Sequence, residues 1–399
     1  MARLRCFLAA LVFGIVLVSG VAKATSTRIL SLGGLSDYFE DDFNILLWYG
    51  SLPDYGNLAV LELGDFYFSR DDADPNQVIR QGAGVHANFD RAQKWGTAAL
   101  YLSDVTDPDQ IPGTLNLMWA RRFGPIQAGL SFQWTLLDEL FLADGDSFRS
   151  KESNSKLGLG LRWDLAERVY TDLAADAVGT WRQYEVQEAG IVIYDEEQRN
   201  SWDSYNLRGR LFWGVAEKVA LVPVFTYQRR DHLTSLTSTN IPADLDAHET
   251  HLGLGVDVFP NSDNMLLFSY EYRTGKERFD IRDNPFDLHQ LENKFHEHNL
   301  RLGLESRVIS WLTLRGGALQ VIPDMNFKAV YLDSGTEDSV TGGFEDPQLD
   351  LNLGIGLHFG AFDADFAFND NAPFSLGYFL TGGGEGDHNF TSITLQYIF

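Results

Sequence analysis

The chain ends on the stretch Phe390-Thr391-Ser392-Ile393-Thr394-Leu395-Gln396-Tyr397-Ile398-Phe399. Large apolar side chains occupy every second position from Ile393 onward, and Thr394 and Gln396 stand between them. Successive side chains of a strand point to opposite faces, so this alternation predicts a strand with one apolar and one polar face. Because the same alternation recurs along most of the chain, it predicts an all-β protein.

The predicted strands are longer than the five or six residues usual in a soluble sheet, as in residues 157–163, 252–258 and 349–359. Sixteen strands are predicted, with ends uncertain by a few residues, at residues 57–68, 80–91, 93–103, 113–123, 125–135, 153–164, 168–186, 201–214, 217–230, 247–259, 263–275, 295–306, 310–321, 347–359, 361–370 and 387–399. Fourteen strands is the alternative, because residues 58–68 alternate poorly and residues 373–380 fit a strand or a loop.

The connections between these strands alternate between short and long. Short turns are predicted at residues 90–93, 123–125, 165–167, 215–217, 260–263, 306–309 and 360, and longer polar loops at 136–152, 230–247, 275–294 and 322–346. Short turns on one side and long loops on the other are typical of outer-membrane barrels. The predicted fold is therefore a transmembrane antiparallel up-and-down β-barrel, with periplasmic turns and extracellular loops.

The beginning of the chain predicts export. Arg3 and Arg5 precede an apolar run at residues 7–18, and Ala22-Lys23-Ala24 fits a cleavage site. Residues 1–24 are therefore predicted to be a signal peptide. The only cysteine, Cys6, lies within it, so the mature chain is predicted to lack disulfides and cysteine metal sites.

The net charge of −25 argues against nucleic acid as a partner. Acidic loops in water explain this charge, and divalent cations that bridge loop carboxylates to lipid headgroups are the alternative. Aromatic residues at both ends of the strands, such as Trp163, Trp213, Tyr227 and Tyr272, fit the two interface belts of a barrel. Outer-membrane lipid and lipopolysaccharide are the expected surroundings.

Two stretches resemble known outer-membrane proteins. The closing strand resembles the last strand of bacterial barrels, in which the terminal aromatic residues, here Tyr397 and Phe399, are read by the barrel-insertion machinery. Residues 27–34 (TRILSLGG) and 40–52 (EDDFNILLWYGSL) resemble the opening of the long-chain fatty acid transporter (FadL-like) family. The usual Asn-Pro is replaced by Gly50-Ser51. The resemblance implies that residues 25–56 form a hatch that plugs the lumen of a barrel formed by residues 57–399.

The face opposite the apolar side chains is predicted to line the lumen. By alternation it carries the charged residues Arg162, Arg182, Arg208, Arg210, Asp257, Glu271, Arg273, Arg301, Arg315, Asp350, Asp363 and Asp365, joined by Asp172, Asp176 and Glu305. Both signs are present, whereas a strongly selective filter has rings of one sign. Cross-strand pairing and a part in selectivity are the two interpretations. Glycines recur on the same face, which indicates room for a segment packed inside.

No catalytic set or cofactor site is predicted. The clusters around His248 and His296 contain imidazole and carboxylate, which suit a metal ion, but solvated rim residues explain them better. Ser269 and His358 belong to distant strands, so the protein is not expected to be an enzyme. The predicted function is a channel for passive passage of small molecules, including apolar ones. The alternative is a structural, adhesive or secretion-associated barrel without transport.

Overall fold

The computed structural model describes residues 25–399 except for residues 35, 65–80, 90–93, 105–112, 144–145, 189–190, 200–201, 203, 237–240, 282–287, 334–335, 345–346 and 369–389. The predicted signal peptide and residues 373–380 lie outside the described residues. Among the residues that are described, no helix is long and apolar enough to cross a membrane.

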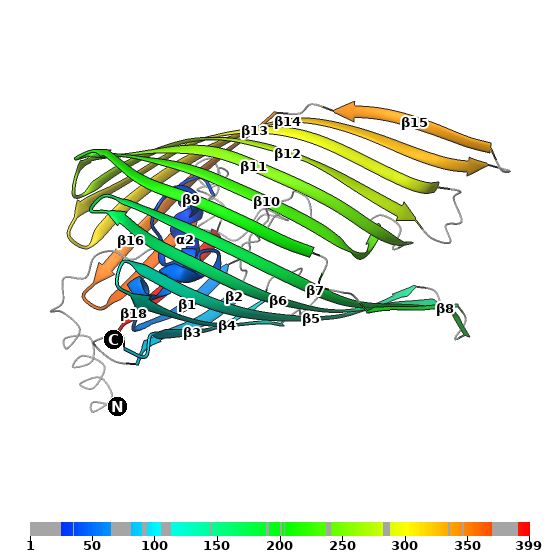
Figure 1. The fold of residues 1–399 in the computed structure, drawn as a ribbon, viewed down its shortest axis with the longest axis horizontal. Coiled ribbons are helices and arrows are strands. Elements are labelled where there is room, and N and C mark those ends of the chain that lie inside the picture. Colours follow the sequence, from blue (N-terminus) through cyan, green and yellow to red (C-terminus); the bar gives the residue numbers. More distant parts are fainter. Residues whose placement is uncertain are drawn as a thin grey trace, which may run out of the picture.

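The described residues form a short helical region followed by strands (Figure 1). The helices are α2 (Ser26–Ser31) and the 3-10 helices η1 (Ser36–Tyr38), η2 (Asp42–Leu46) and η3 (Tyr49–Tyr55). The strands are β1 (Leu58–Gly64), β2 (Gln81–Asn88), β3 (Thr97–Asp104), β4 (Gly113–Phe123), β5 (Ile126–Ala143), β6 (Asp146–Ala166), β7 (Val169–Glu188), β8 (Ile191–Arg199), β9 (Ser204–Ala216), β10 (Val219–Leu236), β11 (Ile241–Asn261), β12 (Asn264–Ile281), β13 (Leu288–Ile309), β14 (Leu312–Asp333), β15 (Thr336–Phe344), β16 (Gln348–Phe359), β17 (Phe362–Phe368) and β18 (Phe390–Ile398).

Sixteen of these strands close into an antiparallel barrel, as the alternation predicts. The last strand, β18, pairs with β1, where Leu58 lies opposite Ile398 and Leu63 opposite Ile393. β7 pairs with β9, and β14 pairs with β16, so the ring closes without β8 and β15. Those two additional strands, which the alternation did not predict, pair with the loop-side ends of β7 and β14.

The strands extend farther on the loop side than predicted. β5 and β6, for example, remain paired up to Ala143 and Asp146, inside the predicted loop 136–152. Most of the predicted loops 230–247, 275–294 and 322–346 are likewise strand. Beyond the membrane both faces of a sheet meet polar surroundings, so the alternation fades while the backbone hydrogen bonds continue. The predicted loops were therefore wrong in these segments.

The outer surface of the barrel is apolar. In β6, Leu159 is 62% exposed, whereas the neighbouring Arg162 on the opposite face is 5% exposed. The same exposure of leucine and aromatic residues recurs on β9, β11, β13 and β16. A closed ring satisfies its backbone hydrogen bonds internally, and an apolar outer face is stable in hydrocarbon. The barrel therefore spans a membrane.

The turn side of the barrel lies at the left of Figure 1, beside the C-terminal end. Gly124 and Gly360 there have φ angles of 62° and 67°, which a side chain would strain. The longest strands, β5 to β7 and β10 to β14, run from this side toward the right of the view.

Candidate functional site in the barrel interior

Residues 25–56, called the N-terminal segment below, fold into short helices with their own caps. The hydroxyl of Thr25 accepts a hydrogen bond from the backbone N–H of Arg28 at the start of α2. After α2, Gly33 and Gly34 have φ angles of 94° and 102°, which glycine adopts without steric cost. The Asp41 carboxylate accepts a hydrogen bond from Phe43 at the start of η2.

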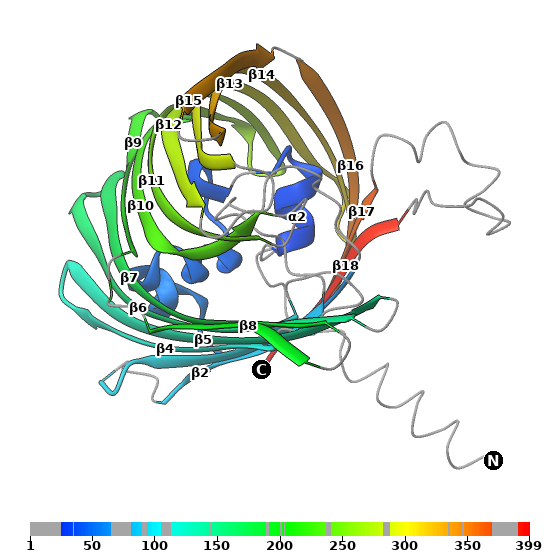
Figure 2. The same ribbon diagram turned by 90° about the vertical axis from the view of Figure 1, so that its right-hand side faces the viewer.

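The N-terminal segment lies inside the barrel (Figure 2) and contacts every strand of the ring. α2 packs against β14, β16, β17 and β18, η1 against β10 and β11, and η3 against β3 to β7. Hydrogen bonds reach the remaining strands: Ser26 to Glu62 on β1, His86 on β2 to the Tyr55 carbonyl, Arg210 on β9 to the Asp37 carbonyl, Tyr38 to Glu271 on β12, and Arg28 to Glu305 on β13.

Two apolar clusters join the N-terminal segment to the inner wall. In the first, Ile29, Leu32, Tyr38 and Phe39 pack against inward side chains of β9, β10 and β12, including Phe212. The second cluster lies across the ring and contains Ile45, Tyr49, Leu52, Val60, Ala99, Tyr101, Met118 and Ala120. Moving the segment out of the barrel would expose the apolar side chains of both clusters to water, which is unfavourable. The two clusters therefore hold the segment in one position inside the barrel, called the seated form below.

Inward glycines make room for the N-terminal segment. The backbone of Gly33 approaches Gly317, and the side chain of Tyr38 fills the space over Gly253 and Gly255. An added Cβ would meet atoms of the segment at Gly129, Gly158, Gly160, Gly253, Gly255, Gly303, Gly317 and Gly354. Gly356 instead faces Asp365 and Arg315 of the wall. The glycines thus mark a close backbone approach at most of these positions.

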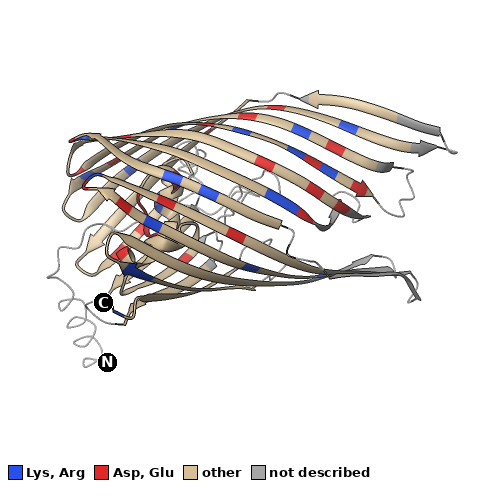
Figure 3. Cartoon of the chain, in the orientation of Figure 1, with Lys and Arg blue, Asp and Glu red and all other residues tan. Residues whose placement is uncertain are grey.

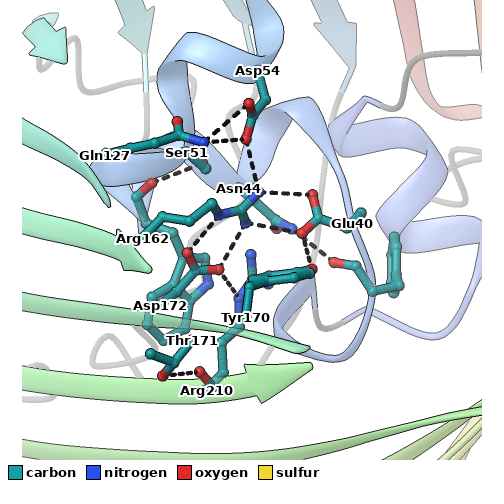
Figure 4. Close-up of polar contacts among 12 residues, drawn as sticks. Glu40, Asn44, Ser51, Asp54, Gln127, Arg162, Tyr170, Thr171, Asp172 and Arg210 are labelled. Carbon is teal, nitrogen blue, oxygen red and sulfur yellow. Dashed lines mark hydrogen bonds and ion pairs between the residues drawn. The ribbon is translucent and has the colours of Figure 1, made fainter. Parts of the chain in front are cut away.

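Arg162 is the centre of one buried ion-pair network (Figure 4). Its guanidinium donates to both Asp172 oxygens at 2.7 and 2.8 Å, and to Glu40 and Asp54 of the N-terminal segment at 2.9 and 3.0 Å. Arg210 donates to the same Asp172 at 2.8 Å. One carboxylate therefore joins β6, β7 and β9, while Arg162 extends the network to the segment.

A second network lies across the ring, at the start of the N-terminal segment. Arg28 and Arg315 donate to Glu305 Oε2 at 2.6 and 2.7 Å, and Arg315 also donates to Asp365 at 2.5 Å. The Thr25 hydroxyl donates to the other oxygen of Asp365 at 2.9 Å. Charge-assisted hydrogen bonds of this kind stabilise buried ions that would be costly alone.

The carboxylates of the N-terminal segment have shifted pKa values. Burial by itself would raise the pKa of Glu40, but the guanidinium groups of Arg162 and Arg210, with hydrogen bonds from Tyr170 and Tyr55, hold that pKa at about 2. Burial raises the pKa of Asp41 to about 7, against the opposing charge of Arg28. Glu40 is therefore held ionised, whereas Asp41 is close to its titration point at neutral pH.

The residues predicted to line the lumen lie on the inner face wherever their side chains are described. The buried ones are Arg162, Arg208, Arg210, Asp257, Glu271, Arg301, Arg315, Asp363 and Asp365. Arg273 and Asp350 are half-buried, and the side chain of Arg182 lies outside the described residues. Several of them form ion pairs with one another or with the N-terminal segment, as Arg208 does with Asp176 at 2.7 Å.

A further inner cluster lies on the loop side of Tyr38. His251 and Arg273 both contact Glu249, and Asn299 donates to Glu271, which accepts from Tyr38 at 2.9 Å. By contrast, His296 and His298 are exposed on the outer face. Within the described ranges, no group of three metal-ligating side chains is close enough to hold an ion. Of the first cluster, Glu249 and His251 therefore face the lumen and His248 faces outward, on the same side of the wall as His296 and His298.

The sequence did not predict which side chains several inward residues contact. His358 lies 2.9 Å from both Asp363 and the Thr313 hydroxyl, which ties β14, β16 and β17 together near the turn side. The Tyr49 hydroxyl donates to Asp176, and Asp54 joins the Arg162 network. The resemblance of residues 27–34 and 40–52 to a hatch was the signal for the segment, but it does not name a partner strand for any residue.

A mainly apolar pocket of 530 Å³ lies at the loop-side ends of β1 to β5. Its lining includes Leu61, Leu63, Leu102, Leu115 and Trp134. Leu61, Leu63, Leu102 and Trp134 are exposed, whereas Glu62 and Ser103, which also line the pocket, are buried. The pocket thus adjoins both faces of the wall.

No protein-family model matches the sequence, and no curated protein matches it. The chain is similar to these solved structures: CdiB from Escherichia coli (9% identity, 86% of this chain and 62% of that chain, TM-score 0.49), the toluene transporter TbuX from Ralstonia pickettii (11%, 94% and 99%, 0.43) and the toluene transporter TodX from Pseudomonas putida (10%, 94% and 96%, 0.42). The chain spans less than two thirds of the CdiB length. Its own closed ring and apolar outer face are those of an outer-membrane barrel.

Proposed function

We propose that the protein is an outer-membrane channel for small apolar molecules, and that the N-terminal segment acts as its hatch, as in FadL-like barrels. The contact of this segment with all sixteen strands carries the proposal. A segment that reaches every strand occupies the cross-section on the turn side. Passage along the axis therefore requires the segment to move.

The charge pattern of the interior supports neutral cargo. Arg162, Arg208, Arg210 and Arg315 are each paired with a carboxylate. Selective ion pathways present rings of one sign, whereas paired charges of both signs attract neither anions nor cations strongly.

A reversible disulfide tests the hatch. The hydroxyls of Thr27 and Ser392 lie 2.6 Å apart, close to the length of an S–S bond, and the predicted mature chain has no cysteine of its own. In T27C/S392C, oxidation is expected to lower protein-dependent uptake of a small apolar probe into lipid vesicles. Reduction is expected to restore the uptake to the level of the native chain. Thr27→Cys alone is the matched control, because it cannot form the link.

The outcomes separate the parts of the proposal. If uptake is the same in the oxidised and reduced forms, the cargo does not need α2 to move, and the hatch is contradicted while the channel stands. If no apolar probe crosses faster with the native protein than without it, the channel is contradicted. The alternative of a structural, adhesive or secretion-associated barrel then gains support.

A further inference from the structure

Basic side chains form a row across the outer face of the barrel, on the loop side. Arg229 of β10 lies directly opposite His248 of β11, which lies opposite Lys276 of β12, which lies opposite Lys294 of β13. These four residues are called the cationic row below. Four adjacent strands therefore present basic groups at the same height, although the chain as a whole is strongly acidic.

The cationic row points away from the lumen. The side chains of Arg229, Lys276 and Lys294 are 43%, 37% and 59% exposed. Thr274 lies two residues closer to the turns than Lys276, and Tyr272 lies four residues closer. Both are on the same face as Lys276. Tyr270 and Phe268 continue this face as exposed side chains. The row is thus the outward continuation of the face that meets lipid.

An aromatic belt fixes the height of the row relative to the membrane. The Tyr272 hydroxyl lies 2.8 Å from His296 Nδ1, and the Tyr270 hydroxyl lies 2.8 Å from His298 Nδ1. Tyr and His rings with apolar bodies and polar tips are suited to the membrane–water interface. The row lies about 14 Å along the strand from Tyr272, since each residue rises about 3.4 Å. This corresponds to the headgroup layer.

Carboxylates on the same face border the row: Asp231, Asp246 and Glu292 each lie two residues farther out than a member of the row, and Asp231 lies opposite Asp246. Lys276 and Lys294 are directly opposed like charges, which is unfavourable; Glu292 bridges them at 2.8 and 3.0 Å. Arg229 has acidic neighbours only at 3.6 and 3.9 Å, beyond normal hydrogen-bond distance. On β14, Asn326 lies opposite Lys294 and donates to Asp324, two residues closer to the turns.

We propose that the cationic row binds the phosphates of a phosphorylated glycolipid in the outer leaflet. Ammonium and guanidinium groups are strong donors to phosphate oxygens, and basic residues at a membrane surface attract anionic headgroups. The row crosses three strand spacings, about 14 Å, which is wide enough for a headgroup with more than one phosphate. Figure 3 shows basic and acidic positions side by side on the loop-side parts of these strands. This inference goes beyond the proposed channel and does not depend on it.

Native mass spectrometry of the full chain in detergent tests the site, with bisphosphorylated lipid A as the probe and its dephosphorylated form as the reference. The native protein is expected to prefer the bisphosphorylated lipid. In R229Q/K276Q/K294Q the affinity should fall about fivefold for each cation removed, on the order of a hundredfold in all. Binding of the dephosphorylated lipid is expected to stay unchanged.

A matched control removes the same charge at the opposite rim. R168Q/K218Q/R307Q changes the exposed Arg168 and Lys218 and the half-buried Arg307, all in or beside the turns, and is expected to bind lipid A as the native protein does. The gel mobility of unheated samples verifies that both variants are folded barrels. Equal loss in the two variants, or native affinity for phosphatidylglycerol equal to that for lipid A, would overturn the proposal.

Discussion

Arg162 illustrates how single residues hold the N-terminal segment to the wall. Its guanidinium pairs with Asp172 on the barrel and with Glu40 and Asp54 on the segment, and lies over the ring of Tyr170 at 4.5 Å. The side chain is only 6% exposed, so removing it leaves charges on both sides without their main partner. Removing one partner of a buried ion pair is strongly destabilising, although replacing the whole pair by well-packed apolar residues is often neutral.

Arg162→Met is expected to lower the free energy of unfolding by roughly 3–5 kcal/mol, because it leaves buried carboxylates uncompensated. Urea titration of the barrel in lipid bilayers measures this change. Arg122→Met is the control, since Arg122 also pairs with Asp54 but is 44% exposed. Exposed pairs contribute about 1 kcal/mol or less. Equal losses in the two variants would contradict the assignment of Arg162 as the main link.

The shifted pKa of Glu40 predicts that the stability of the seated segment depends on pH. Its pKa of about 2 is below the ordinary 4.5, so ionised Glu40 stabilises the seated form above pH 4.5, and this contribution is lost as the pH falls toward 2. The protection factors of the η2 and η3 amides against hydrogen exchange are expected to fall as the pH is lowered from 4.5 to 2. The effect is moderated because the Glu40 side chain is 40% exposed.

Glu40→Gln is the control for this pH dependence, because the amide does not titrate. The variant is expected to lose the step between pH 4.5 and 2. Asp41 acts in a different window and with the opposite sign: its pKa is raised to about 7, so its protonation below that pH favours the seated form. An unchanged step in Glu40→Gln would assign the dependence to another group.

Among the elements, the short helices of the N-terminal segment pack closely against the strands because the strands carry glycine at the contact points. Gly253 and Gly255 on β11 leave the space that Tyr38 of η1 fills, and Gly317 on β14 admits the turn at Gly33. Glycine is usually unfavourable in a strand interior. Its recurrence on the inner face is explained by the close approach of a second backbone.

Gly253→Val is expected to unseat η1, because an added Cβ would overlap the Tyr38 side chain. The barrel itself should still form, since valine suits a strand. Cleavage by a glutamate-specific protease after Glu40, the only glutamate of residues 25–56, is expected to accelerate. Gly316→Val is the control, where the nearest atom to an added Cβ is 3.8 Å away. Equal protection in both variants would contradict the close fit.

At the scale of the whole molecule, the barrel is closed by the pairing of its first and last strands. The backbone N–H of Phe399 donates to the Asn57 carbonyl at 3.0 Å, while its side chain is 57% exposed. The ring of Phe399 therefore adds little to the seam, which the β1–β18 pairs already hold. A role in recognition during assembly remains a prediction from the sequence.

Phe399→Ser is expected to reduce the amount of folded barrel in cells several-fold, but to leave spontaneous folding into detergent micelles unchanged. The two measurements separate recognition by the insertion machinery from stability of the barrel. Phe359→Ser removes an aromatic ring of similar exposure on the same turn side and serves as the control. If both variants assemble equally in cells, the terminal residue is not read as a signal.

Local patterns predicted the positions of the sixteen ring strands. The alternation in residues 157–163 or 349–359 defines an inward and an outward face without knowledge of any partner. It did not predict β8 or β15, or the paired ends of β5 and β6, because strands in water lose the contrast between their faces. The inward orientation of Arg162 and Asp172 follows from parity, but their shared bonds to the segment do not.

The strands and their apolar and polar faces follow from the sequence alone, because a period of two residues is a local property of each strand. Which groups meet inside and outside the closed ring depends on the tertiary structure. Thr25 and Asp365, or Arg28 and Glu305, are joined across nearly the whole chain. The alignment of Arg229, His248, Lys276 and Lys294 likewise depends on the register between strands, which hydrogen bonding fixes only when the ring closes.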